Sequence, residues 1–101
     1  MKKENQFLHL TPGTVEVGIN PALLRAGERM HIDQERLEHA KKVVKEGKIG
    51  LLEVTPEGVI IHGHHRAYAA YLAGVLVDVI VKPWSQEPGL FIPDLPIKRR
   101  Q

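Results

Sequence analysis

The residues from Val59 to Gly74 have the types and spacing best suited to chemistry in this chain. Three β-branched residues begin the run and an alanine-rich stretch ends it at Gly74, which predicts a strand, a polar turn and a helix. A helix that begins at such a turn directs unpaired backbone N–H groups and the positive end of its dipole toward the turn. The pattern therefore predicts a binding site for a phosphate or a carboxylate.

The centre of this run supplies the groups that would hold the anion, and it reads His62-Gly63-His64-His65-Arg66. Gly63 has no Cβ, so an anion can approach the main chain closely. Arg66 can add a bidentate pair of hydrogen bonds. We expect phosphate to be bound by Gly63, His64, His65 and Arg66, with the ring of His65 neutral while the site is empty.

A helix and a hairpin precede this turn and should position it. Asp33 is the predicted N-cap of a helix that stops at Gly47, and its buried face contains Leu37, Ala40 and Val44. Residues 49–54 and 59–61 are the predicted strands of the hairpin. The four residues between them, Thr55-Pro56-Glu57-Gly58, suit a type I turn.

Shorter elements are predicted nearer the N-terminus. Val15 and Val17 indicate a short strand, and Asn20-Pro21 is typical of the start of a helical turn. Residues 25–31 are charged and contain glycine, which favours a loop. We expect this loop to face the histidine-rich turn across a cleft.

A strand and a proline-rich tail follow the turn. Residues 75–81 are almost continuously apolar, which predicts a central strand buried on both faces. With the helix before it, this strand completes a βαβ unit in which it runs parallel to residues 59–61. The tail carries prolines at 83, 88, 93 and 96 and ends in basic residues. We expect residues 83–101 to form an extended arm without regular structure that docks on the domain.

Composition limits the classes of protein to which the chain can belong. Its 101 residues suffice for one domain, which we expect to span residues 7–82. The absence of cysteine excludes disulfides and thiol catalysis, and no transmembrane or signal segment is predicted, so we expect a cytoplasmic protein. The net charge of +2 leaves nucleic acid open as a partner.

The segment Gly63-His64-His65-Arg66, with Ala69-Ala70 and Gly74 after it, resembles the signature of the ParB/sulfiredoxin-like superfamily. The resemblance extends over about residues 14 to 82 in the expected order of elements. It implies a small α/β domain with a mixed sheet and flanking helices. Members of this superfamily hold nucleotides at the corresponding turn, so the resemblance implies ATP, ADP or CTP as the ligand, with Mg²⁺ as a further candidate.

Differences from the individual subfamilies narrow what the resemblance implies. Sulfiredoxins carry a cysteine where this chain has His64, and ParB partition proteins continue into further domains for which this sequence has no room. Free serine kinases have Asp-Gly-His-His-Arg, so His62 replaces their aspartate. In a kinase-like protein, Glu28 would act as the base toward an acceptor hydroxyl.

Three other functions stay open at the sequence level. A ParB-like nuclease would use the same anion site, with a histidine such as His64 activating water or a bound metal. A metal site formed by His62, His64 and His65, of which we single out only His62 and as a weak candidate, would be favoured if folding brought His31 or His39 near. A third alternative is an interaction module that binds DNA or protein through its basic arm. Our leading prediction is a nucleotide-binding or phosphate-ester-binding domain.

Overall fold

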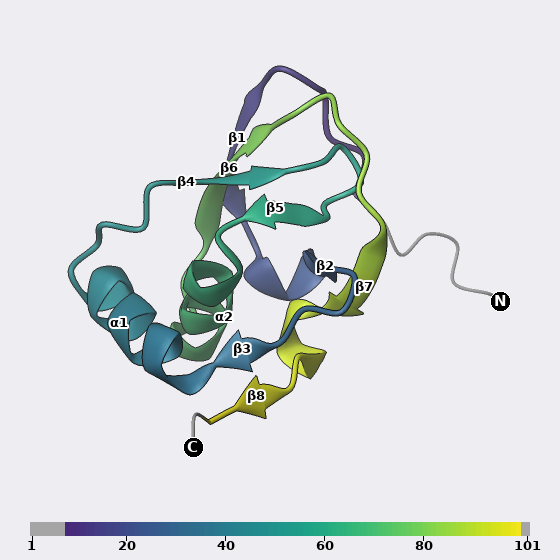
Figure 1. Cartoon of the computed structure of the whole chain (residues 1–101). Coiled ribbons are helices and arrows are strands. Elements are labelled where there is room, and N and C mark those ends of the chain that lie inside the picture. Colours follow the sequence, from purple (N-terminus) through teal and green to yellow (C-terminus); the bar gives the residue numbers. More distant parts are fainter. Residues whose placement is uncertain (1–7, 100–101) are drawn as a thin grey trace, which may run out of the picture.

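The largest sheet of the protein has four strands in the spatial order β1-β6-β4-β5, as seen in a computed structural model that describes residues 8–99 (Figure 1). These strands are β1 (Val15–Ile19), β6 (Val77–Val81), β4 (Leu51–Val54) and β5 (Ile60–His62). The sheet is mixed, because β4 is parallel to β6 while the outer pairs, β1 with β6 and β4 with β5, are antiparallel. The predicted α/β class with a mixed sheet and flanking helices is therefore confirmed.

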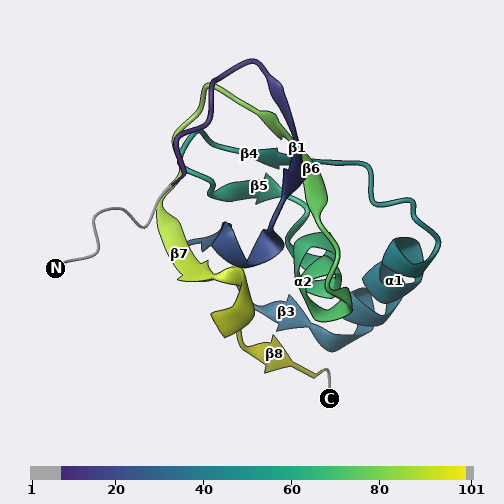
Figure 2. The same cartoon turned by 180° about the vertical axis from the view of Figure 1, so that it is seen from behind.

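Two α-helices, α1 (Gln34–Lys45) and α2 (His64–Ala73), lie together on the same side of this sheet (Figures 1 and 2). Asp33 caps α1 by accepting a hydrogen bond from the Arg36 N–H at 3.2 Å, as predicted. The buried residues of α1 are the predicted ones, namely Leu37, Ala40 and Val44. A 3₁₀ turn, η1 (Pro21–Leu23), begins at Asn20, whose side chain accepts from the N–H of Ala22.

The hairpin of β4 and β5 was correctly predicted, but its relation to β6 was not. The N–H of Gly58 donates to the carbonyl of Thr55 at 2.9 Å and so closes the predicted turn. However, β4 lies between β5 and β6, and β5 is antiparallel to β4. Therefore β5 and β6 are neither adjacent nor parallel. The parallel pair is β4 with β6, because β5 folds back to the sheet edge before α2 crosses to the other side of β4.

Strand β6 is internal to the sheet, as predicted, but it is not buried on both faces. Val77, Val79 and Val81 are buried in the hydrophobic core, whereas Asp78 on the opposite face is exposed. The strand also begins at Val77 and not at Val75. Both helices lie on the same side of the sheet, and among the described residues no second layer covers its outer face.

The predicted loop at residues 25–31 is a strand at its start, and the C-terminal segment explains why. Strand β2 (Arg25–Gly27) pairs antiparallel with β7 (Pro88–Phe91), and β3 (Ile32–Asp33) pairs in parallel with β8 (Ile97–Lys98). A 3₁₀ turn, η2 (Ile92–Asp94), lies between the two C-terminal strands (Figure 1). Strand β2 is short and depends on a partner far away in the sequence. Its residues therefore show no alternation of apolar and polar side chains from which a strand could be predicted.

The segment after β6 docks on the domain, as expected, but it contains the regular structure that we did not predict. Ile92 is fully buried and Leu95 is 5% exposed, and both belong to the same hydrophobic core as the helices. Proline has no backbone N–H, but the ends of short edge strands and the start of a 3₁₀ turn do not require one. The prolines of this segment are therefore compatible with the strands and the turn that it forms. The predicted start of the domain at residue 7 and the end of the arm at 100–101 lie outside the described residues. Among the helices at 8–99, none is long and apolar enough to cross a membrane.

Candidate functional site

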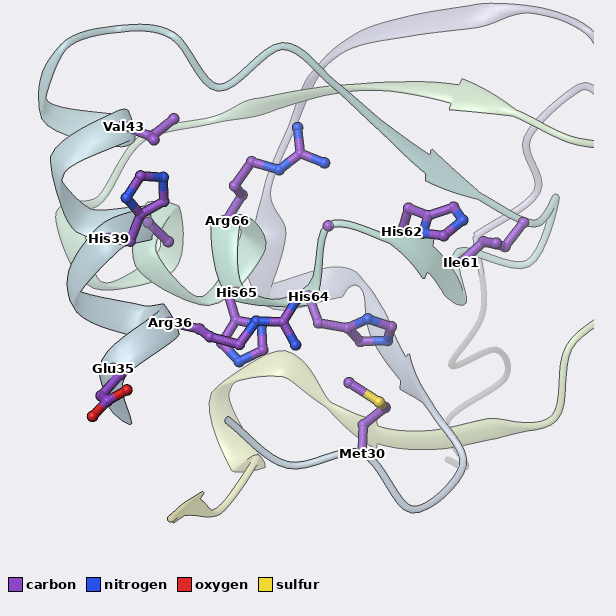
Figure 3. A pocket seen from close by; sticks show the side chains of 12 residues that line it. Met30, Glu35, Arg36, His39, Val43, Ile61, His62, His64, His65 and Arg66 are labelled. Carbon is purple, nitrogen blue, oxygen red and sulfur yellow. The ribbon is translucent and has the colours of Figure 1, made fainter. Parts of the chain in front are cut away.

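A cleft of about 680 Å³ lies between α1 and the turn that connects β5 to α2 (Figure 3). The side chains that line it and can carry charge are Glu35, Arg36, His39, His62, His64, His65 and Arg66. Two of these are arginines and only one is a carboxylate, so the cleft favours an anionic ligand. The turn predicted from the sequence therefore lies at the edge of a real cavity.

Gly63 gives the turn its shape and could not be replaced without disturbing the core. Its φ of 112° and ψ of 24° lie in the left-handed region, where a residue with a side chain is strained. A Cβ at this position would come within 2.6 Å of Leu52 Cδ2, on a side chain that is fully buried. The absence of Cβ is thus needed for packing against β4 as well as for access to the backbone.

Helix α2 begins at this glycine without a side-chain cap. Gly63, at the N-cap, makes no side-chain hydrogen bond to the first turn, and that turn contains no acidic residue. The N–H of Ala67 makes the first helical bond, to the carbonyl of Gly63 at 2.9 Å. The N–H groups of the first turn precede this bond and have no partner within the helix. They supply partial positive charge where His64, His65 and Arg66 border the cleft.

His64 is held by the backbone of β2. Its Nε2 accepts a hydrogen bond from the N–H of Gly27 at 3.1 Å, and the residue is only 8% exposed. The pKa of His64 is lowered from 6.5 to about 4, chiefly by burial, and the neighbouring charges of His65 and His62 contribute to the same lowering. Because Nε2 is an acceptor, the ring is neutral and carries its proton on Nδ1.

His65 is held in the same manner by β3, one strand further along the chain. Its Nε2 accepts from the N–H of Asp33 at 3.0 Å. Burial lowers the pKa of His65, the cation of Arg36 also lowers it, and the carboxylate of Asp33 acts in the opposite direction. The direction of this shift favours the neutral form that we predicted for His65, with burial as its main cause.

Arg66 connects α2 to the chain segment that enters β4. One Nη1 hydrogen of its guanidinium goes to the carbonyl of Ile49 at 2.7 Å. A guanidinium has five N–H donors, so this bond fixes the side chain while other donors remain for a ligand. Its Nη2 lies 3.2 Å from the place where a Cβ of Gly63 would be, so the guanidinium passes close to the turn.

The C-terminal segment supports both histidine anchors. Gly27, which donates to His64, lies in β2 and pairs with β7, while Asp33, which donates to His65, lies in β3 and pairs with β8. Gly89 of β7 approaches β2 so closely that a Cβ there would lie 2.5 Å from the Gly27 carbonyl oxygen. Two strands that the sequence did not predict therefore position the motif that it did predict.

The structure brings Gly63, His64, His65 and Arg66 to one cleft but leaves Glu28 outside it. Glu28 is exposed in the turn after β2 and does not line the cavity. The carboxylate that does is Glu35, in the first turn of α1. His62 lies at the rim and is exposed. Within residues 8–99, no group of three or more His, Cys, Asp or Glu side chains is placed to hold a metal ion.

Arg36 is the contribution to the cleft that sequence reasoning missed. It lies on α1, and His39 lies three residues later, so both side chains can face the same cavity (Figure 3). Their spacing was visible in the sequence. It was uninformative because an exposed helix commonly carries such residues on its solvated side.

Searches against protein-family models, curated proteins and solved structures found no match to this chain.

Proposed function

We propose that this protein binds a phosphate ester, and specifically a nucleotide such as ATP, ADP or CTP, in the cleft between α1 and α2. The observation that carries the proposal is the uncapped start of α2 at a left-handed glycine, bordering a cavity lined by two arginines. A helix N-terminus of this kind provides several N–H donors and a favourable dipole for a phosphate. The cavity volume of about 680 Å³ is within the usual range for small-molecule sites.

The binding roles follow from which donors are already engaged. We assign the phosphate to the first-turn N–H groups of α2, to the remaining donors of Arg66 and to Arg36. His64 and His65 each use Nε2 to accept from the backbone, so we treat them as positioning residues that fix the helix start. The neutral His64 ring retains its Nδ1 proton as a single further donor.

The resemblance of Gly63-His64-His65-Arg66, Ala69-Ala70 and Gly74 to the ParB/sulfiredoxin-like signature supports the same ligand class. In that superfamily the corresponding turn holds nucleotide phosphates. With Glu28 outside the cleft and His62 in place of the kinase-type aspartate, we propose binding and not phosphoryl transfer as the function. Mg²⁺, where present, would be bound chiefly through the phosphates of the nucleotide.

Calorimetric titration of ATP, ADP, CTP and inorganic phosphate, each with and without Mg²⁺, tests this proposal. The variant Arg36→Ala removes an exposed cation that lines the cleft, and Lys42→Ala removes an exposed cation from the same helix outside it. A charge-assisted hydrogen bond is worth about 1.5–3 kcal/mol. We therefore expect Arg36→Ala to weaken nucleotide binding roughly tenfold or more, and Lys42→Ala to leave it near the wild-type value.

Arg66→Lys provides a second test, because lysine can still donate to the Ile49 carbonyl but cannot form a bidentate contact. We expect it to remain folded, by circular dichroism, and to bind nucleotide more weakly. Wild-type protein that binds none of the four ligands, or equal losses in Arg36→Ala and Lys42→Ala, would contradict the proposal.

A further inference from the structure

A second and smaller cavity, of about 320 Å³, lies beside the turn that joins β2 to β3. Its lining includes Arg29, His31 and Lys98, together with the exposed apolar side chain of Leu90. Within residues 8–99, no carboxylate side chain lines it. A small cavity with two permanent cations and a histidine suits one phosphate group.

Met30 connects this cavity to the cleft, because its side chain lines both. Figure 3 shows Met30 on the far side of the cleft from α1, next to His64. The closeness of the two cavities also appears in the electrostatics, since the charge of His31, in the second cavity, lowers the pKa of His65, in the first. In the part of the chain that the structure describes, the two cavities together are lined by four permanent cations, Arg29, Arg36, Arg66 and Lys98, and by one carboxylate, that of Glu35.

The two basic cavities are thus separated by an apolar, adaptable side chain. The phosphates of a nucleoside triphosphate are contiguous and leave no apolar group between them. In a single-stranded nucleic acid, by contrast, each phosphate is separated from the next by a nucleoside. The methionine side chain is flexible and adapts to apolar surfaces of different shapes. Met30 can therefore support a base or sugar while the cavities on either side hold successive phosphates.

We propose that the natural ligand is a single-stranded oligonucleotide, with one phosphate at the start of α2, the next at Arg29 and Lys98, and the intervening nucleoside over Met30. This inference rests on the proposed function, because it uses the same cleft for the first phosphate. It deepens that proposal from a mononucleotide to a polymeric ligand.

The test compares a fluorescently labelled single strand of about eight nucleotides with the matching mononucleotide and with a duplex of the same sequence. Arg29 has a φ of 65°, which glycine adopts without strain, so Arg29→Gly removes the charge without straining the backbone. Lys98→Ala alters only a side chain in β8. The control double variant, Lys42→Ala with Lys45→Ala, removes the same number of exposed cations from α1.

We expect the wild-type protein to bind the strand more tightly than the mononucleotide or the duplex. The Arg29→Gly/Lys98→Ala variant should bind the strand roughly tenfold more weakly, with a salt dependence less steep by about 0.7 in the log–log slope. It should bind the mononucleotide as the wild type does. The control variant should match the wild type for every ligand.

Three results would overturn the inference. One is an equal loss of strand binding in the control variant, which would indicate diffuse attraction to a basic surface. The second is unchanged strand binding in Arg29→Gly/Lys98→Ala while Arg36→Ala still weakens the mononucleotide, which would leave the proposed function intact and remove the extension. The third is equal affinity for strand and duplex. Failure of both strand and mononucleotide to bind would remove the proposed function as well.

Discussion

Acidification should destabilise this protein substantially through His64. The pKa of His64 is lowered from 6.5 to about 4 in the folded protein, so the unfolded chain binds the proton more tightly. Its contribution to stability is therefore complete above pH 6.5, is lost progressively as the pH falls, and is exhausted below about pH 4. The pKa of His64 is lowered because the residue is only 8% exposed and because its Nε2 must stay unprotonated to accept a hydrogen bond.

The size of the effect follows from the difference between the two pKa values. Each unit of difference corresponds to 1.36 kcal/mol, so the free energy of unfolding should fall by about 3 kcal/mol between pH 7 and pH 4 from this residue alone. A domain of this length has a total stability of only about 5–15 kcal/mol. Protonation of one histidine should thus remove a large share of it.

Urea denaturation followed by far-ultraviolet circular dichroism at a series of pH values measures this contribution. The variant His64→Gln keeps an oxygen that can accept from the Gly27 N–H but does not titrate. The wild type should lose about 3 kcal/mol relative to this variant between pH 7 and pH 4. His39→Gln, which replaces an exposed histidine of α1, should retain the pH dependence of the wild type. Parallel curves for the wild type and His64→Gln would refute the reasoning.

Three further substitutions, with Leu90→Ala as a control, test how the site is supported. Ile92→Ala should lower the free energy of unfolding by about 2–5 kcal/mol, because Ile92 is fully buried, whereas Leu90→Ala, at a side chain that is 51% exposed, should change it by far less. Gly89→Ala places a Cβ 2.5 Å from the Gly27 carbonyl oxygen, so it should separate β2 from β7, cost about 1–3 kcal/mol by urea denaturation, and weaken nucleotide binding. Asp33→Ala removes the N-cap of α1 and should cost about 1 kcal/mol in the same assay. An unchanged stability in Ile92→Ala or Gly89→Ala would show that the C-terminal segment does not support the core.

Local patterns were sufficient for the elements whose determinants are close together in the sequence. The N-cap Asp33, the turn closed by Gly58 and the helix that ends at Gly74 each depend on contacts within a few residues. The helix-start geometry at Gly63 belongs to the same group, because a glycine between a strand and an alanine-rich helix is itself a local signal. These elements also account for the predicted anion site.

Local sequence patterns could not predict which segments pair with the short strands. Strand β2 has three residues and β3 has two, and each is stabilised by a partner more than sixty residues away in the sequence. A two-residue strand has no period, and the prolines of its partner segment argued against regular structure. The antiparallel course of β5 relative to β6 had the same origin, since only the insertion of β4 between them sets it.

The sequence was therefore enough to locate the main residues of the candidate site. Their burial and their neighbouring charges are set by packing between segments that are far apart in the chain. Gly63, His64, His65 and Arg66 are adjacent in the chain, so folding places them on one turn however the rest of the protein is arranged. Three other features depend on segments that folding brings together from β2, β3, α1 and the C-terminal strands. His64 is neutral and buried, Arg36 lines the cleft, and Met30 separates two basic cavities. Burial and electrostatic interactions depend on distance in space, and for these residues that distance is set by the tertiary fold.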